Sequence, residues 1–248
     1  MNSKGNSFAH RKFRAASQDR FLQQPVKGRG ALVGVIADPV ALRTATHLRQ
    51  PPDLFELRLD ALRDYSQEVE DALPRLHAPL ILTARHPAAG GRGALSSAAR
   101  SRLLRRFLSH ATWIDLELRS VPNFAPLLAE ARQRKIGVII SSHRLRGTPP
   151  IHALQNHLAS AIAAGADIFK IASRTDTRTQ LHCLLAFFNE NCARFPVAAM
   201  GLGALGAESR RRLLHLGSVL NYAHLGQTNA PGQLSLAQLR RARAANIS

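Results

Sequence analysis

A single lysine lies within an apolar run that has the composition of a buried β-strand, Asp-Ile-Phe-Lys-Ile-Ala at residues 167–172. Burial removes water from an ammonium group and lowers its pKa. Lys170 is therefore expected to pair with an acidic side chain or to be a neutral amine, and neutral amines attack carbonyl carbons to form Schiff bases. A third possibility is an edge-strand lysine whose amine extends to solvent. The run alone favours this third possibility, and the rest of the chain reverses that preference.

Other ionisable residues occupy similar strand-like runs. Successive side chains of a strand point to opposite faces, so residues two apart share a face. Ionisable residues fall on one face of the runs at 54–59 and 113–118. Others lie on or just after the runs at 80–84, 136–141 and 167–172. They are Glu56, Arg58, Asp60, Arg85, Asp115, Glu117, His143 and Lys170.

The runs belong to a pattern that repeats eight times from Ala31 onward, in which a β-branched or leucine-rich segment precedes a helical stretch. The expected strands are Ala31–Ala37, Leu54–Leu59, Leu80–Ala84, Trp113–Leu118, Ile136–Ser141, Asp167–Ala172, Pro196–Met200 and Ser218–Tyr222. The clearest expected helices are Ala94–His110, Asn123–Arg134, Pro150–Ala164 and Thr177–Asn191. Within this pattern Asn123 and Thr177 are expected N-caps, and Gly137 and Gly165 are expected left-handed helix ends.

Alternation of strands and helices indicates a parallel sheet, and eight units indicate an α/β protein with a single (β/α)8 TIM-barrel domain. An open doubly wound sheet is the alternative. Such a sheet normally carries a glycine-rich turn after its first strand, and Ala37-Asp38-Pro39 is not one.

In a barrel, the faces that carry the ionisable residues point to the interior, and active sites form at the carboxyl ends of the strands. Arg85 and His143 fall at such ends. A salt-bridge network that closes the barrel floor would explain Asp60 and Asp115, but buried charge is costly and apolar side chains fill a barrel without it. A lysine near an imidazole therefore points to imine chemistry on a small anionic carbonyl compound, with His143 as the proton-transfer group.

Several ordered motifs extend this interpretation from about Ala31 to the C-terminal helix. They are Phe-Glu-Leu-Arg-Leu-Asp (55–60), Leu-Thr-Ala-Arg (82–85) followed by Gly90-Gly91, Ile-Asp-Leu-Glu-Leu (114–118), Ile-Ser-Ser-His (140–143) with Thr148-Pro149, Asp-Ile-Phe-Lys-Ile-Ala (167–172), Gly206 to Arg210 with Gly217-Ser218, and Ala-Pro-Gly-Gln (230–233). Each motif is weak alone, but their order and spacing together resemble the type I 3-dehydroquinate dehydratase family of the shikimate pathway. The resemblance implies a barrel that forms a homodimer and needs no metal or organic cofactor.

The resemblance also implies a mechanism. Lys170 would attack the ketone of 3-dehydroquinate to form an iminium, His143 would remove the adjacent proton and then protonate the departing hydroxyl, and hydrolysis would release 3-dehydroshikimate. Arg210 would bind the substrate carboxylate, which a guanidinium matches with two hydrogen bonds. Further substrate-binding or orienting residues implied by motif position are Glu56, Arg58, Arg85, Asn229 and Gln233, the last on a loop that closes over the substrate.

Three positions depart from the pattern of the family. Ala89 stands where members usually carry a glutamate that partners the catalytic histidine, Asn229 where a serine is common, and Leu202 where a second methionine accompanies Met200. The change at Leu202 conserves volume, and Asn229 can still form hydrogen bonds. Without a carboxylate partner His143 is expected to have a lower pKa and a less fixed orientation, so activity is expected to be retained but reduced.

The formal charge of the 248 residues is +18, yet the arginines are scattered and no nucleic-acid motif accompanies them, so no specific nucleic-acid partner is expected. No apolar run approaches the roughly 20 residues of a membrane span. The protein is therefore expected to be cytoplasmic. Residues 1–29 are polar and basic and are expected to form a disordered tail ahead of the catalytic domain at 30–248.

Three other functions compete with the dehydratase. A class I aldolase-like lyase also uses a lysine on a barrel strand, but it would split a carbon–carbon bond. A catalytically weakened or non-enzymatic barrel homologue that binds a small anionic ligand is favoured by Ala89 and opposed by intact Lys170, His143 and Arg210. Nucleic-acid binding through the basic surface predicts a steep salt dependence.

Overall fold

The computed structural model describes residues 30–245, and within them parallel strands and helices alternate along the chain. The basic tail expected at residues 1–29 lies outside the described residues. The strands are β1 (Ala31–Ile36), β2 (Leu54–Arg58), β3 (Leu80–Thr83), β4 (Ala111–Glu117), β5 (Gly137–Arg144), β6 (Ile168–Arg174), β7 (Val197–Leu202) and β8 (Leu220–His224). Each expected strand is confirmed, with ends that move by up to three residues.

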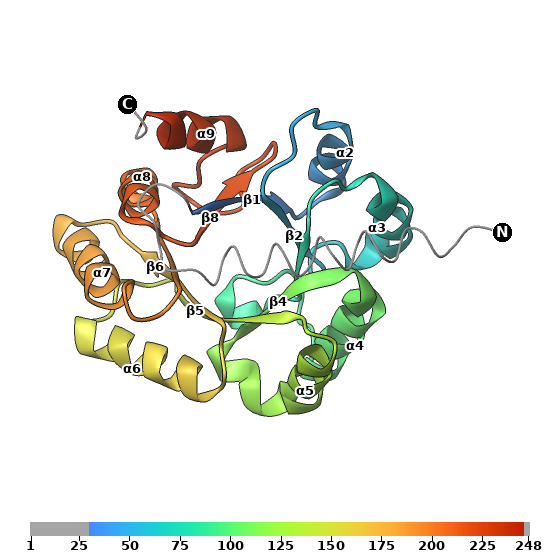
Figure 1. Ribbon diagram of the computed structural model, residues 1–248, viewed down its shortest axis with the longest axis horizontal. Coiled ribbons are helices and arrows are strands. Elements are labelled where there is room, and N and C mark those ends of the chain that lie inside the picture. The colour runs from blue at the N-terminus through green and yellow to red at the C-terminus, as the bar shows by residue number, and fades with distance from the viewer. Residues whose placement is uncertain (1–29, 246–248) are drawn as a thin grey trace.

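The strands form one sheet in the order β7-β6-β5-β4-β3-β2-β1-β8, and every neighbouring pair is parallel. The two outer strands of this order meet at a seam, where the backbone N–H of Val219 donates to the carbonyl of Val197 over 3.1 Å. Ser218 Oγ accepts from the backbone N–H of Ala199 over 3.1 Å at the same seam. The sheet is therefore a nearly closed barrel with helices outside it (Figure 1), as the alternating pattern predicts.

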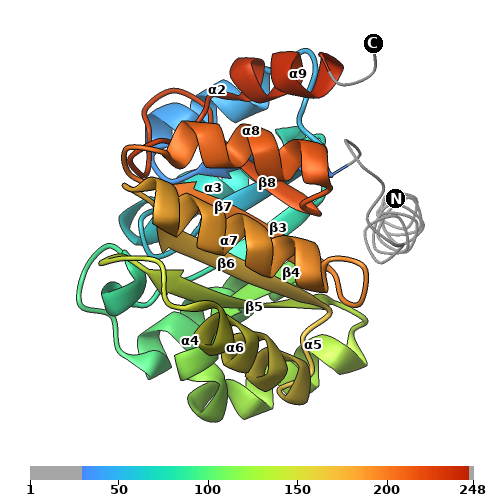
Figure 2. The same ribbon diagram turned by 90° about the vertical axis from the view of Figure 1, so that its left-hand side faces the viewer.

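The helices cover the outside of the barrel, and α6, α7 and α8 lie side by side over its strands (Figure 2). The α-helices are α2 (Pro39–His47), α3 (Ser66–Ala72), α4 (Ser97–Phe107), α5 (Ala125–Gln133), α6 (Ile151–Ala163), α7 (Arg178–Asn191), α8 (Gly206–Leu216) and α9 (Leu236–Ala244). Short 3-10 helices are η1 (Arg63–Tyr65), η2 (Leu73–Arg75), η3 (Pro87–Ala89), η4 (Leu108–His110) and η5 (Leu118–Phe124). No helix among residues 30–245 is long and apolar enough to cross a membrane.

The helix caps agree with the sequence-based predictions at two positions and differ from them at two others. Thr177 caps α7 in a capping box with Gln180, and Gly165 adopts φ +77° after α6. The prediction for Asn123 is wrong, because η5 continues to Phe124 before α5 begins. The prediction for Gly137 is also wrong, because Lys135 takes the left-handed conformation at φ +54°. A Cβ on Gly137 would lie 2.3 Å from the Trp113 ring, so this glycine serves packing inside the barrel.

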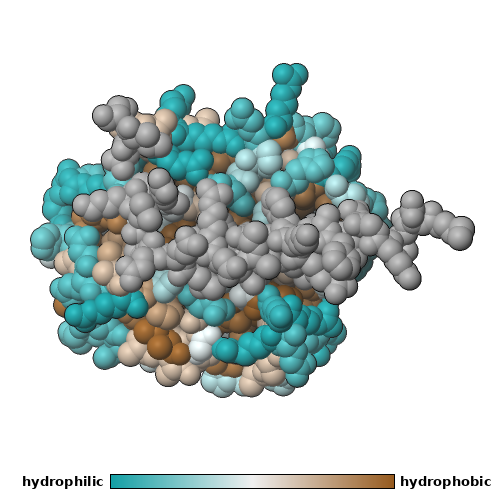
Figure 3. All heavy atoms as spheres, in the orientation of Figure 1, coloured by the Kyte–Doolittle hydropathy of each residue, from teal (hydrophilic) through white to brown (hydrophobic). Residues whose placement is uncertain are grey.

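The described residues form three buried apolar clusters, and the two larger ones follow from the alternation of side chains along the strands, while the third lies around Leu214 and Leu239. The largest cluster lies between strands and helices and contains Phe55, Leu57, Phe169 and Phe187. The second cluster fills the barrel interior and is built around Trp113. On the face shown in Figure 3, hydrophilic residues form most of the outline of the described part, with apolar patches between them.

Candidate active site

On five adjacent strands, β2 to β6, the inward-facing side chains change from apolar to polar between one inward position and the next. Apolar residues of β2 to β6 form a buried layer of Leu54, Ile81, Trp113, Ile139 and Ile168. Two residues further along each strand, a second buried layer consists of Glu56, Thr83, Asp115, Ser141 and Lys170. Because residues two apart share a face, the polar layer lies directly above the apolar one, toward the carboxyl ends of the strands.

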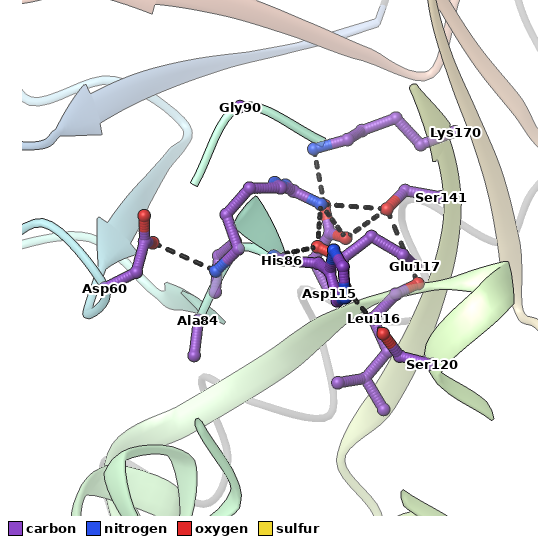
Figure 4. A network of polar contacts seen from close by, with 12 residues as sticks. Asp60, Ala84, His86, Gly90, Asp115, Leu116, Glu117, Ser120, Ser141 and Lys170 are labelled. Carbon is purple, nitrogen blue, oxygen red and sulfur yellow. Dashed lines mark hydrogen bonds and ion pairs between the residues drawn. The ribbon is translucent and has the colours of Figure 1, made fainter. Parts of the chain in front are cut away.

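Asp115 is the centre of the polar layer. Lys170 Nζ forms a close ion pair with its Oδ2, and Ser141 Oγ donates to its Oδ1 over 2.6 Å, so Asp115 on β4 is contacted from the adjacent strand β5 and from β6 beyond it (Figure 4). Lys170 Nζ also lies 3.6 Å from Glu56 Oε1. Burial alone would raise the pKa of Asp115, but Arg85 and Lys170 hold it well below its usual value. Of the possibilities for a buried lysine, the structure therefore has the acid-paired one.

Arg85 connects the carboxylates of this layer. Its Nη1 and Nη2 each lie 3.0 Å from one oxygen of Asp115, which is the two-pronged geometry of a guanidinium–carboxylate pair. Nη1 also donates to Glu117 Oε1 over 3.0 Å, and Nη2 lies 3.4 Å from Glu56 Oε1. Since carboxylates of this chain occupy both terminal nitrogens, the contacts fit an orienting role for Arg85 better than a role in holding ring hydroxyls.

His143 lies at the end of β5 and is partly exposed, but its Nδ1 is buried and has no hydrogen-bond partner among the described residues. Burial, together with the positive charges of Arg85 and Lys170, lowers the pKa of His143 well below its usual value. The imidazole is therefore neutral at pH 7 and able to accept a proton.

A cavity of about 310 Å³, here called the active-site cavity, opens above the polar layer. The sequence-predicted site residues all line it: Lys170, His143, Glu56, Arg58, Arg85, Arg210, Asn229 and Gln233. Met200 and Leu202 of β7 add an apolar wall. Residues from separate parts of the chain thus meet at one cavity, as the (β/α)8 pattern predicts.

The arginines of the cavity differ in their pairing. Arg58 Nε and Nη2 lie 3.0 and 2.8 Å from the carboxylate oxygens of Asp60, whereas Arg210 forms no ion pair within residues 30–245. Arg210 is buried in α8, its Nη1 donates to the carbonyl of Tyr222 over 3.1 Å, and its Nε has no partner among the described residues. Burial lowers the pKa of Arg210 to about 10. A buried, unpaired guanidinium at a cavity is suited to bind an anionic ligand.

The loop between β8 and α9 approaches α8 closely. A Cβ on Gly232, which has φ +77°, would lie 2.7 Å from the Cα of Gly206, the first residue of α8. Gln233 Oε1 accepts from the backbone N–H of Asn229 over 2.8 Å, which fixes the fold of this loop. The glycine of Ala-Pro-Gly-Gln therefore lets the loop pack beside the helix that carries Arg210.

A family model described as type I 3-dehydroquinase matches residues 38–246, which include every strand from β2 to β8. The chain belongs to this family. The 3-dehydroquinate dehydratase of Thermococcus gammatolerans is 30% identical over 213 residues, which are 84% of this chain and 95% of that protein. Among solved structures, 3-dehydroquinate dehydratase from Geobacillus kaustophilus is 25% identical with a TM-score of 0.78, and the match covers 90% of this chain and 91% of that one. The enzyme from Enterococcus faecalis is 28% identical with a TM-score of 0.74, over 90% and 96% of the two chains.

The family pattern has a glutamate at the position of Ala89, and the loss of that carboxylate can be seen in the structure. Ala89 is buried at the end of η3 and lines the active-site cavity beside His143. Its methyl group has no acceptor, and Nδ1 of His143 remains without a partner among the described residues. This agrees with the expectation of a histidine with a lowered pKa.

Sequence reasoning missed Tyr222, which lines the cavity from β8. The ring centroid of Tyr222 lies 4.3 Å from Lys170 Nζ, close enough for a cation–π contact. Its hydroxyl is buried with no partner among the described residues, and burial, with the nearby Glu56 and Asp115, raises its pKa well above the usual value. The sequence feature that could have identified Tyr222 is its position at the end of the last expected strand, on the same face as Leu220.

Two acidic residues, Asp60 and Asp115, join neighbouring segments of the site through ion pairs and hydrogen bonds. Asp60 accepts from the backbone N–H groups of Arg85 and Arg92 over 3.0 and 2.9 Å, so it joins the loop after β3 to the end of β2. Asp115 holds Arg85, Ser141 and Lys170 together. Both residues thus form the expected ion pairs, but the prediction that the network closes the barrel floor is wrong, because it lies above the apolar layer, toward the carboxyl ends of the strands, where it positions Lys170 at the cavity.

Proposed function

We propose that this protein is a 3-dehydroquinate dehydratase, a carbon–oxygen hydro-lyase of the shikimate pathway that converts 3-dehydroquinate into 3-dehydroshikimate and water. The observation that carries the proposal is one cavity, lined by a lysine amine, a neutral imidazole and an unpaired guanidinium, in a chain of the type I 3-dehydroquinase family. The relatives that match most of this chain have the same name.

The first step is imine formation by Lys170. Its ammonium group must lose a proton before attack, and neutral His143 is a better acceptor than Asp115, whose pKa is held well below the usual value. The amine adds to the ketone carbon, and His143 returns its proton to the carbinolamine hydroxyl, which leaves as water to give an iminium and a neutral imidazole. The positive iminium replaces the ammonium beside Asp115, Glu56 and the Tyr222 ring, so these groups stabilise charge before and after the bond forms.

The second step is elimination of water from the ring. The iminium acidifies the neighbouring carbon–hydrogen bond, because the electron pair left behind delocalises into the C=N bond. His143 accepts this proton and then donates it to the departing hydroxyl, which leaves as water. A second water hydrolyses the imine, which regenerates Lys170 and releases 3-dehydroshikimate.

Binding of the substrate carboxylate is assigned to Arg210, since it has no ion-pair partner among the described residues. We assign the ring hydroxyls to Glu56, Arg58, Asn229 and Gln233, which line the same cavity. Because His143 lacks a carboxylate partner, its orientation is less restricted, and we expect activity to be roughly 10- to 100-fold below that of a partnered site, by analogy with lost outer-shell contacts at metal sites.

Reductive trapping tests the proposal. The purified protein is mixed with 3-dehydroquinate, reduced with borohydride, digested and analysed by mass spectrometry, and product formation is followed in parallel. We expect an adduct on the peptide that contains Lys170. Lys135, which is exposed and serves as the control lysine, should carry none. The variant Lys170→Ala should give neither adduct nor product. A folded protein that gives no adduct would refute the imine mechanism.

The alternative function is a barrel homologue that binds a small anionic ligand with little or no turnover. Ala89 and the unpartnered Nδ1 of His143 favour it. Adduct formation without release of 3-dehydroshikimate would support this alternative, and cleavage of a carbon–carbon bond would instead indicate another Schiff-base lyase. Two further proposals rest on the family resemblance: a homodimer, which light scattering of the purified protein tests, and a cytoplasmic location, which cell fractionation tests.

A further inference from the structure

A second cavity of about 220 Å³, here called the side cavity, lies at the ends of β4 and β5. It shares only two lining residues with the active-site cavity, His143 and Ala89. The imidazole of His143 therefore stands in the wall between the two cavities. A water molecule occupies about 30 Å³ in the liquid, so the side cavity has room for a small organic molecule.

The lining of the side cavity is positively charged. Arg119 and Arg144 both contribute to it, and neither side chain forms an ion pair with any of residues 30–245. His157 lines the cavity as well, with Nδ1 3.2 Å from Ser142 Oγ. Unpaired guanidinium groups around a partly enclosed space attract anions and bind carboxylates with two hydrogen bonds.

The one carboxylate of the lining is already neutralised. Glu117 accepts from Arg85 Nη1 and the backbone N–H of His86 through Oε1, and from Arg100 and Ser120 through Oε2. Arg100 pairs with Glu117, and Arg85 divides its contacts between Glu117, Asp115 and Glu56. Glu117 therefore has no oxygen left for His143, and it does not cancel the positive charge of Arg119 and Arg144.

Nδ1 of His143 is the polar atom that this arrangement leaves unsatisfied. It is buried and has no hydrogen bond within the described residues, whereas buried polar atoms normally have a hydrogen-bond partner. A catalytic imidazole needs an acceptor at one nitrogen so that the other presents its lone pair to the substrate. Because His143 and Ala89 both line the side cavity, a small turn about the Cβ–Cγ bond would bring Nδ1 to the space beside Ala89.

We propose that the side cavity binds a small monocarboxylate of the formate or acetate class, which accepts a hydrogen bond from Nδ1–H of His143 and is held by Arg119 and Arg144. The bound carboxylate is a positioning group supplied from solution. It fixes the tautomer in which Nε2 is free to act as the base in the active-site cavity. Its effect on turnover rests on the proposed dehydratase function, whereas its binding does not.

Binding is measured without any assay of activity. The ¹⁵N resonances of histidine rings are recorded while formate or acetate is added at constant ionic strength, and the signal of His143 is assigned with His143→Ala. We expect a saturable shift of this signal with acetate and none with acetamide, which has the same shape without the charge. Arg119→Met should weaken binding several-fold, whereas Arg75→Met, which removes an exposed arginine outside the cavity, should not. Equal shifts with acetamide, or no shift, would overturn the proposal.

Turnover is then measured in the same titrations. We expect kcat to rise roughly 3- to 10-fold, a fraction of the 10- to 100-fold loss that a missing outer-shell partner causes. Ala89→Glu should be faster than the parent protein and insensitive to formate, because its own carboxylate fills the space, and Ala89→Leu should be slow and insensitive. A formate response that persists in Ala89→Leu would contradict the assignment of the site. Ring shifts without any turnover would leave the anion site standing and reject the dehydratase proposal instead.

Discussion

Replacing Arg100 by methionine tests the charge balance beneath the active site. Arg100 is fully buried in α4, lies 5.0 Å from the Phe124 ring centroid, and donates to Ala84 O, Ser120 Oγ and Glu117 Oε2. It belongs to a buried cluster in which three cations oppose three carboxylates, so that the formal charges cancel. The members are Arg85, Arg100, Lys170, Glu56, Asp115 and Glu117.

The expected magnitude follows from this balance. Removal of one partner of a buried ion pair destabilises a protein by about 3–5 kcal/mol, because the remaining charge is buried and uncompensated, whereas replacement of both partners is often close to neutral. Arg100→Met leaves the cluster with a net negative charge, and Glu117→Gln leaves it with a net positive charge. We expect each single change to cost about 3–5 kcal/mol, and the double variant, in which the formal charges again cancel, to cost no more than one single change.

The assay is urea unfolding followed by the fluorescence of Trp113, which is fully buried inside the barrel. The four proteins of the double-mutant cycle are compared at one pH. The exposed pair of Arg106 and Glu70, whose Nε and Oε1 lie 2.8 Å apart, is the matched control and should show little coupling. Additive free energies for Arg100→Met and Glu117→Gln would refute the argument from charge balance.

Three further predictions concern the active-site cavity. Arg210→Met should leave the free energy of unfolding unchanged or raise it, since a buried unpaired cation is removed, but should lower kcat/KM by roughly 100-fold or more, because charge-assisted hydrogen bonds contribute about 1.5–3 kcal/mol each. The acid limb of kcat/KM should lie below pH 6.5, since His143 must be neutral to act as a base and its pKa is lowered, and Ala89→Glu should move that limb to higher pH. Tyr222→Leu should slow adduct formation with borohydride by roughly 2- to 30-fold through the loss of about 0.5–2 kcal/mol of cation–π energy, whereas Tyr222→Phe, which keeps the ring, should not.

The barrel was predictable because its signals are local and repeat. Runs such as Ile136–Ser141 are continuous apolar segments, as expected of strands buried on both faces. The alternation of faces then sends Glu56, Asp115 and Lys170 to the barrel interior before any contact is known, since residues two apart share a face, whereas their common layer depends on the register of the strands. The same geometry explains why the predicted site residues line one cavity.

The partners of these residues were not predictable, because they depend on packing between distant segments. Four arginines occur at Arg100, Arg102, Arg105 and Arg106, and only the first enters the core. Helical spacing places Arg100 on the same face as Leu104 and Phe107, so its burial had a signal, but its hydrogen bonds with Ala84 O, Ser120 and Glu117 had none. The left-handed conformation of Lys135 was likewise hidden, because glycine is the residue that usually adopts it.

The distribution of paired and unpaired arginines limits which substrates the cavity favours. Arg58 is neutralised by Asp60, Arg174 by Asp176, and Arg85 by the carboxylates of the polar layer, so none of these adds a free positive charge. Arg210 is the cation of the cavity lining that lacks an ion-pair partner among the described residues. One carboxylate on the substrate therefore completes the charge balance of the active-site cavity. A second anionic group would have to displace an internal carboxylate from its arginine. A neutral analogue would leave Arg210 buried and unpaired. The cavity therefore favours a monoanionic carbonyl compound over both dianionic and neutral compounds.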